Sequence, residues 1–216
     1  MSLRVGTPNN PLRLAVMISG GGSGMKALFE HVENKQSSCH TTVIVLSDQS
    51  EAKGHAIAQQ FGVLSISIPL PEDIADSKSR RLIHEKSIET KLMQNEVEAI
   101  ILSGYMRILT PDFVSRWEGR ILNIHPSLLP KFPGAHAHQE VLSSGESKSG
   151  CTVHFVDSGM DTGAIIEQSE VPVYAHDTLE NLQERVKKVE HRLYPKIIDL
   201  FSEGKIRLID GEIIRK

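Results

Sequence analysis

The feature that most constrains the fold of this 216-residue chain is a regular alternation of short apolar runs with longer stretches of helical pattern. Five runs are rich in β-branched and other apolar residues: 12–18, 41–46, 63–68, 97–102 and 120–124. Helical patterns lie between them, near 24–35, 51–60, 77–95 and 111–117. Strands that are apolar throughout and separated by helices predict a parallel sheet covered on both faces. We therefore expect an α/β, Rossmann-like fold: a mostly parallel, twisted sheet with helices on both faces.

The second half of the chain departs from this alternation after residue 145. We expect two further strands at 150–157 and 164–173, joined by a polar loop, and then a long helix from Asp177. Glu180, three residues on, completes the pattern of a capping box. Pro195 should kink or shorten this helix, because proline has no N–H to donate and its ring clashes with the preceding turn.

Composition narrows the class of protein. The formal net charge of −3, with 24% charged residues, gives no global attraction to nucleic acid or to a membrane surface. The two cysteines, Cys39 and Cys151, form no CxxC pair and fit a reducing compartment. No apolar run is long enough to cross a bilayer, and the start has no apolar signal segment. We therefore expect a cytoplasmic protein with one domain at 12–216, preceded by a mobile tail at 1–11.

A glycine-rich loop follows the first expected strand: Ser19-Gly-Gly-Gly-Ser-Gly24, after which a helical pattern begins. Glycines at a strand-to-helix turn let the backbone approach a ligand, and the free N–H groups of the new helix favour an anion, typically phosphate. A tight turn without a ligand is the simpler alternative, but four glycines and two serines exceed what a turn needs. The loop therefore predicts a phosphate site.

The kind of phosphate ligand is less constrained. The P-loop pattern fails, because Met25 stands where its second glycine belongs and Ala27 where its Ser or Thr belongs. A dinucleotide fingerprint can be matched as Gly22-x-Gly24-x-x-Ala27, and Asp48 at the end of the second strand could then contact a ribose. This leaves an NAD-dependent oxidoreductase as an alternative, although Asp48 fits a turn or a helix N-cap equally well.

The most informative segment is 120–134, which contains Asn123-Ile-His125-Pro126. Proline cannot continue a strand within the ladder, so Asn123 and His125 should lie at the carboxyl end of the fifth strand. Two residues apart on an extended chain, they point to the same side, and ligands of open α/β sheets bind outside the carboxyl ends of the strands. An amide donor and a titratable ring in that crevice could bind a developing oxyanion and exchange protons with it.

Other polar residues are ambiguous from the sequence alone. His136 and His138 suggest a metal at first glance, but no third ligand has suitable spacing, so we expect no metal site. Asp161, in a polar loop, fits a functional residue and a solvated turn equally well. Arg107 could contact a ligand or be a surface charge, and the basic cluster at 78–81 opens a helix and is by default solvated.

Six segments match a known family in order, from about residue 12 to residue 201: Ile18-Ser-Gly-Gly-Gly-Ser23, Gly104-Tyr-Met-Arg-Ile-Leu109, Leu122-Asn-Ile-His-Pro-Ser-Leu-Leu-Pro130, Gly150-Cys-Thr-Val-His-Phe-Val156, Met160-Asp-Thr-Gly163 and Glu190-His-Arg-Leu-Tyr-Pro195. They resemble the phosphoribosylglycinamide formyltransferases of the folate-dependent formyltransferase family. The Asn-x-His-Pro-Ser-Leu-Leu-Pro block is specific to folate-dependent formyl transfer. Methionyl-tRNA formyltransferases and formyltetrahydrofolate deformylases share it, so it indicates the chemistry better than the acceptor.

The resemblance implies an enzyme that transfers a formyl group from 10-formyltetrahydrofolate, as co-substrate, to the primary amine of glycinamide ribonucleotide in de novo purine biosynthesis. It implies three catalytic residues, Asn123, His125 and Asp161, and no metal. A carboxylate at Asp161 near His125 would be expected to raise the pKa of that histidine. The implied binding residues are, for the nucleotide phosphate and ribose, Gly21, Gly22, Ser23, Gly24, Lys78 and Glu190, and, for the folate, Met106, Arg107, Ile108 and Leu109.

Two observations refine what the resemblance implies. The family loop usually has Asn after its Gly-Ser or Gly-Thr pair, where this chain has Gly24, so the detail of phosphate binding should differ. The tRNA enzymes resemble this domain with an added carboxyl-terminal domain, and the deformylases add an amino-terminal regulatory domain, whereas these 216 residues show neither. We therefore expect small-molecule partners, the nucleotide and the reduced folate, and neither nucleic acid nor membrane.

Overall fold

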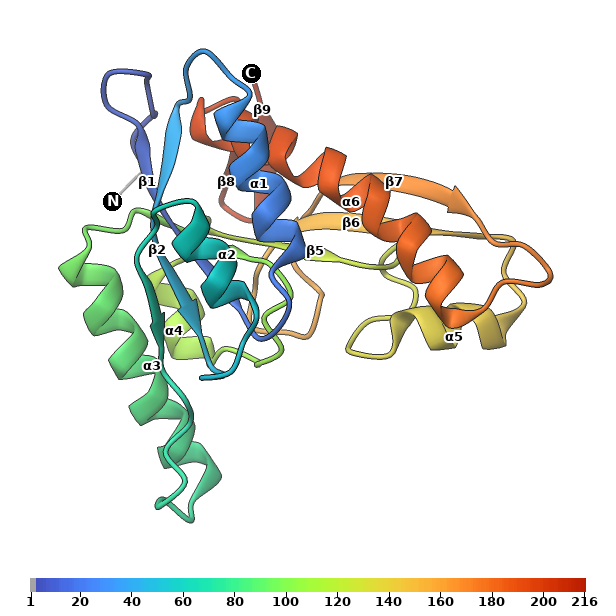
Figure 1. The fold of residues 1–216 in the computed structure, drawn as a ribbon, viewed down its shortest axis with the longest axis horizontal. Helices are drawn as coiled ribbons and strands as arrows, with labels where there is room; N and C mark the ends of the chain where they lie inside the picture. The colour runs from blue at the N-terminus through green and yellow to red at the C-terminus, as the bar shows by residue number, and fades with distance from the viewer. Residues whose placement is uncertain (1–2) are drawn as a thin grey trace.

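The structure, a computed structural model, describes residues 3–216 and is built on a seven-stranded sheet (Figure 1). The strands are β1 (Leu12–Ile18), β2 (His40–Ser47), β3 (Ser65–Ser67), β4 (Ala99–Leu102), β5 (Ile121–His125), β6 (Lys148–Phe155) and β7 (Ile165–Pro172). Their order across the sheet is β3-β2-β1-β4-β5-β6-β7. The first five are parallel, and β6 and β7 are antiparallel additions at one edge. The mostly parallel sheet expected from the sequence is confirmed.

Helices cover both faces of this sheet. They are α1 (Ser23–Glu33), α2 (Gly54–Gln60), α3 (Ser77–Gln94), α4 (Pro111–Arg116), α5 (Ala137–Ser144) and α6 (Leu179–Ser202). Successive residues of β1 enter two different cores. Leu14 and Val16 pack in the core that includes α1 and α6, whereas Ala15 and Met17 pack in the core that includes α3 and α4. From Leu14 to Ile18 every position of β1 is apolar, because both faces of this part of the strand are buried.

Helix α6 continues through Pro195 to Ser202, so the proline does not shorten the helix, which was one of the two expected effects. The turn after the proline buries Ile197, Ile198 and Phe201 in the sheet core. Burial of side chains of this size contributes about 1.5–3 kcal/mol each, which outweighs the loss of one backbone hydrogen bond. Packing therefore decides the length of this helix against the local preference of proline.

Several local features differ from the sequence-based expectation or were absent from it. The N-cap of α6 is Thr178, and Asp177 instead pairs with Arg185 at 2.6 Å. Helix α5 occupies a segment for which no helix was expected. A small antiparallel hairpin follows α6, formed by β8 (Ile206–Ile209) and β9 (Glu212–Arg215). In the part of the chain that the structure describes, no helix is long and apolar enough to cross a membrane.

The N-terminal segment was expected to be a mobile tail, and its described part, 3–11, packs on the domain. The guanidinium of Arg4 pairs with Glu98 at 2.5 Å and donates to the carbonyl of Pro11 at 2.8 Å. The N–H of Gly6 donates to the carbonyl of Ser202, at the end of α6, also at 2.8 Å. Residues 1–2 of the expected mobile tail lie outside the described residues.

Tyr194 connects α6 to the two strands that lead into the crevice. Its hydroxyl lies 3.0 Å from the carbonyl oxygen of Leu102 and 2.8 Å from that of Leu122, and the residue is buried. These carbonyls belong to the last residue of β4 and to the residue before Asn123 in β5. Burial raises the pKa of Tyr194, so the hydroxyl stays protonated and can donate. The contact fixes α6 against the carboxyl ends of both strands.

We predict that Tyr194→Phe lowers the free energy of unfolding by about 1–3 kcal/mol, because it removes a buried donor and leaves the carbonyls short of a partner. Denaturant unfolding with an unchanged m-value measures this loss. Tyr174→Phe is the control, since Tyr174 is 59% exposed and its change should stay within about 0.5 kcal/mol. Equal stability of Tyr194→Phe and wild type would show that the hydroxyl does not stabilise the strand ends.

Candidate active site

Two of the expected site residues project from the end of β5. The strand ends at His125, before Pro126, and Asn123 lies two residues earlier on the same side. The antiparallel partner β6 places His154 directly opposite Asn123 and Thr152 opposite His125. The crevice at the carboxyl end of β5 is therefore walled on one side by β6.

Asp161 reaches this point from the loop between β6 and β7. Its Oδ2 lies 3.2 Å from Nδ1 of His125 and accepts a hydrogen bond from the N–H of Gly134 at 2.8 Å. Its Oδ1 lies 3.5 Å from the Asn123 amide nitrogen. Asp161 has a φ of 57°, a conformation that is uncommon for a residue other than glycine. The structure thus brings Asn123, His125 and Asp161 together, although 38 positions separate the first from the last.

The charges of this group are set by burial and by hydrogen bonds acting against each other. Burial would raise the pKa of Asp161, but the neighbouring His154 ring, the hydrogen bond from the Gly134 N–H and the nearby His125 ring outweigh it and lower that pKa. Asp161 is therefore a carboxylate near neutral pH. Burial lowers the pKa of His125, although the Phe132 carbonyl and the Asp161 carboxylate both act to raise it. The expected effect of the Asp161 carboxylate is therefore present, but burial is larger and the net pKa of His125 is lowered.

Both ring nitrogens of His125 face acceptors inside the protein. Nδ1 faces Asp161, and Nε2 lies 2.8 Å from the carbonyl oxygen of Phe132, which also accepts from the Ser127 hydroxyl at 3.1 Å. A protonated ring would satisfy both acceptors at once. Donation from His125 to a substrate oxygen requires one of these partners to be exchanged.

His154 is a site residue that sequence reasoning missed. It is buried, its Nδ1–H donates to the carbonyl of Phe155 at 2.8 Å, and its Nε2 lies 3.2 Å from the Asn123 amide nitrogen and 3.6 Å from Asp161 Oδ1. With Nδ1 as the donor, Nε2 is placed to accept from Asn123 and so orients that amide. The only signal in the sequence was its place in the Gly150-Cys-Thr-Val-His-Phe-Val segment, because contact with Asn123 depends on strand register.

The glycine loop leads from β1 into α1 as expected. Gly22 is the N-cap residue of α1, with a φ of 69°, and no side chain caps the helix. No acidic side chain lies in the first turn. Side chains added at Gly20 or Gly21 would meet nothing within 4 Å, so the loop borders open space. Free N–H groups beside open space at a helix start are the kind of donors that favour an anion, so the expected phosphate site stays a prediction.

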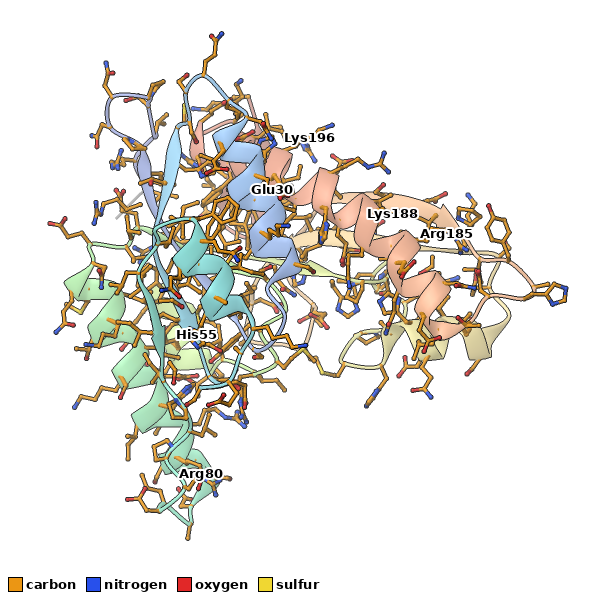
Figure 2. The ribbon with its side chains drawn as sticks, viewed as in Figure 1. Glu30, His55, Arg80, Arg185, Lys188 and Lys196 are labelled. Carbon is orange, nitrogen blue, oxygen red and sulfur yellow. The ribbon has the colours of Figure 1, made fainter. Side chains whose placement is uncertain are left out.

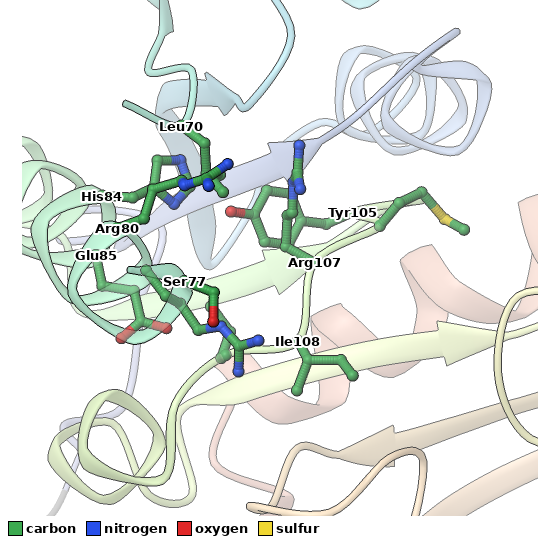
Figure 3. A pocket seen from close by; sticks show the side chains of 11 residues that line it. Leu70, Ser77, Arg80, His84, Glu85, Tyr105, Arg107 and Ile108 are labelled. Carbon is green, nitrogen blue, oxygen red and sulfur yellow. The ribbon is translucent and has the colours of Figure 1, made fainter. Parts of the chain in front are cut away.

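The segment expected to bind folate lines a cavity of about 300 Å³ (Figure 3). Side chains of α3 and of the segment after β4 face each other across it, as Figure 3 shows for Arg80 and Arg107. Met106 and Ile108 are exposed, and Leu109 is buried in the sheet core. All of the expected folate residues line this cavity, and they are joined there by Leu70, Ser77, Arg80, Arg81, His84, Glu85 and Tyr105.

Asp48 has a role other than the ribose contact of the dinucleotide alternative. Its side chain is 2% exposed, and Oδ2 accepts from Nε of Arg107 at 2.7 Å and from the Gln49 amide at 2.9 Å. Burial acts to raise the pKa of Asp48, but hydrogen bonds from Ser19, Arg107 and Gln49 outweigh it and lower that pKa. Because the Asp48 carboxylate is buried and paired with Arg107, it is not placed to contact a ribose. The dinucleotide fingerprint therefore lacks the acidic residue that would bind the ribose.

The two remaining expected residues differ in their surroundings. Lys78 is exposed near the start of α3, and the cavity next to it is lined by Arg80 and Arg81 instead. Figure 2 shows Arg80 on the part of α3 that extends away from the sheet. Glu190 lies on α6, and burial raises its pKa to about 7. Among residues 3–216, no group of three or more His, Cys, Asp or Glu side chains is arranged to hold a metal ion.

Comparisons with known proteins agree with this geometry. A family model described as Formyl transferase matches residues 12–198. The phosphoribosylglycinamide formyltransferase of Escherichia coli is 37% identical over 198 residues, which cover 91% of this chain and 90% of that protein. A crystal structure of phosphoribosylglycinamide formyltransferase from Brucella melitensis superposes with a TM-score of 0.80 at 40% identity, covering 95% of this chain and 100% of that one.

A second group of relatives is much longer. The trifunctional purine biosynthetic protein adenosine-3 of Chironomus tentans is 41% identical over 201 residues. The aligned region covers 92% of this chain but 14% of that protein. The residues matched by the family model, 12–198, include Asn123, His125 and Asp161. The chain belongs to the formyl transferase family, among the phosphoribosylglycinamide formyltransferases.

Proposed function

We propose that this protein transfers a formyl group from 10-formyltetrahydrofolate to the primary amine of glycinamide ribonucleotide, a step of de novo purine biosynthesis, in the cytoplasm. The observation that carries the proposal is the meeting of Asn123, His125 and Asp161 at the end of β5, in a chain of this family. An amide donor, a buried imidazole and a carboxylate are the groups that acyl transfer to an amine requires.

The cavity beside 105–109 suits a reduced folate. That co-substrate has flat rings and an anionic glutamate tail. The lining offers apolar side chains such as Met106 and Ile108, together with the cations Arg80, Arg81 and Arg107. Asp48 holds Arg107 at the cavity by its Nε, which leaves the outer guanidinium nitrogens available for an anion. Met106, Arg107, Ile108 and Leu109 are the residues we propose for folate binding.

The nucleotide would bind on the other side of the crevice. The N–H groups at the start of α1 favour its phosphate, and the loop Gly21, Gly22, Ser23 and Gly24 would surround it. Glu190, with its pKa raised to about 7, could either donate to or accept from a ribose hydroxyl near neutral pH. Nothing in the contacts of Lys78 supports its phosphate role, which stays a prediction.

The chemistry then follows from the groups at the end of β5. The amine nitrogen bonds to the formyl carbon, the bond from that carbon to the folate nitrogen breaks, and one proton passes from the amine to the folate nitrogen. Asn123 donates to the formyl oxygen as it gains negative charge. Asp161, a carboxylate, accepts the amine proton directly or through water. That same proton passes on to the folate nitrogen by way of the His125 ring beside Asp161, so no second proton is needed. A well-placed donor such as Asn123 is worth about 10²–10³ in rate.

The acceptor assay tests the proposal. With 10-formyltetrahydrofolate as donor, we expect glycinamide ribonucleotide to be formylated far faster than water hydrolyses the donor, and methionyl-tRNA to be inactive as an acceptor. Equal loss of the donor with and without the nucleotide would instead identify a deformylase. A protein that binds reduced folate but turns over none of these acceptors would be a ligand-binding module.

His154→Phe tests whether His154 orients the Asn123 amide. The variant keeps an aromatic ring of similar size but removes the nitrogen 3.2 Å from the amide. We expect kcat to fall about tenfold, the size of one lost buried hydrogen bond, with both KM values nearly unchanged. His55→Phe is the control, because His55 bonds to Ser65 beside the distant strand β3. A kcat no lower than that of the control would show that Asn123 is oriented without His154.

A further inference from the structure

Gly24 and Ser103 compete for one space beside the glycine loop. Gly24 is the second residue of α1, and a Cβ added there would lie 2.7 Å from the Ser103 hydroxyl oxygen. That separation is shorter than side-chain contacts allow, so a side chain at position 24 and the observed Ser103 hydroxyl exclude each other. Glycine at this position is therefore explained by Ser103 and not by an unusual backbone conformation. This is the position where the family pattern usually has asparagine.

The backbone of Ser103 is fixed at the end of β4. Its N–H donates to the carbonyl of Met17 in β1 at 2.9 Å, and the next residue, Gly104, accepts from the N–H of Ser19 at 3.0 Å. The residue is 9% exposed, and its hydroxyl has no hydrogen-bond partner within residues 3–216. The oxygen is not among the fully enclosed unpaired atoms of that range. It is therefore accessible beside the glycine loop, where a ligand could satisfy it.

The start of α1 lies beside this hydroxyl. Helix α1 has 11 residues, no side-chain cap and no acidic residue in its first turn. An anion at such a helix start is stabilised by the free N–H groups and by the helix dipole. Ser103 is nine-tenths buried as a residue, and its unpartnered hydroxyl adds one more donor at the same place. The orientation of that hydroxyl is maintained because position 24 has no side chain.

We propose that the Ser103 hydroxyl donates a hydrogen bond to the phosphate of the acceptor nucleotide, and that Gly24 is required to leave room for it. The inference rests on the proposed function, because the phosphate is that of the nucleotide. Ser103 is here a binding residue that replaces, from β4, the donor that a side chain at position 24 would supply from α1.

A set of three variants tests the pair: Ser103→Ala, Gly24→Asn and the double variant. In the wild-type background, Ser103→Ala should raise KM for glycinamide ribonucleotide about tenfold or more, the size expected for one hydrogen bond to a charged group. The folate KM and kcat should change less than twofold. In the Gly24→Asn background the same substitution should cost far less, because the new asparagine already displaces the hydroxyl and the two changes are not additive.

Ser202→Ala is the matched control. Ser202 is fully buried and its hydroxyl also lacks a partner, but it lies at the end of α6. It should leave both KM values unchanged. An unchanged nucleotide KM in Ser103→Ala, an equal cost in both backgrounds, or an equal rise in the folate KM would each overturn the proposal.

Binding of ribose 5-phosphate, followed by calorimetry, separates this inference from the proposed function. If the wild type formylates no acceptor but binds ribose 5-phosphate, and Ser103→Ala weakens that binding about tenfold, the phosphate contact stands and the proposed function fails. If the wild type formylates the nucleotide and Ser103→Ala leaves both KM and ribose 5-phosphate binding unchanged, the contact fails and the function stands.

Discussion

The contact between the Asp161 carboxylate and the buried ring of His125 is the interaction on which the site depends. A buried carboxylate is costly unless donors surround it, because it gives up its hydration. Here the donors come from separate parts of the chain: the ring at the end of β5 and the N–H of Gly134 in the following loop, with His154 of β6 beside them. Satisfying one charge therefore ties two strands and two loops into a single arrangement.

Two opposing effects on the pKa of His125 allow its ring to exchange a proton beside Asp161. Burial favours the neutral ring in the free protein, while the adjacent carboxylate and the Phe132 carbonyl are both placed to receive a protonated one. A ring held near this balance can gain a proton as charge develops and release it afterwards. The sheet provides the rigidity, since β5 is hydrogen-bonded on both sides and Tyr194 fixes its end.

The sequence predicted the parallel sheet because both-face burial leaves a direct signature, namely consecutive apolar residues such as 14–18 in β1 and 99–102 in β4. It also placed Asn123 and His125 in the crevice, because a proline marks the strand end. Contacts between distant segments left no such signature: neither the pairing of His154 with Asn123 nor that of Asp48 with Arg107 follows from spacing. Pro195 misled for a related reason, since its effect on the helix was overruled by packing that only the tertiary structure shows.

The dependence of kcat on pH, compared between wild type and Asp161→Asn, tests the central claim most directly. The asparagine keeps the shape but removes the charge, so kcat should fall at least about 100-fold, the lower end of what a positioned acid–base group contributes. The carboxylate raises the pKa of His125 while burial lowers it more, so removing the carboxylate should lower that pKa further. The acidic limb should then move to lower pH. A near-native kcat with an unmoved limb would show that Asp161 is an ordinary turn residue and would contradict the account.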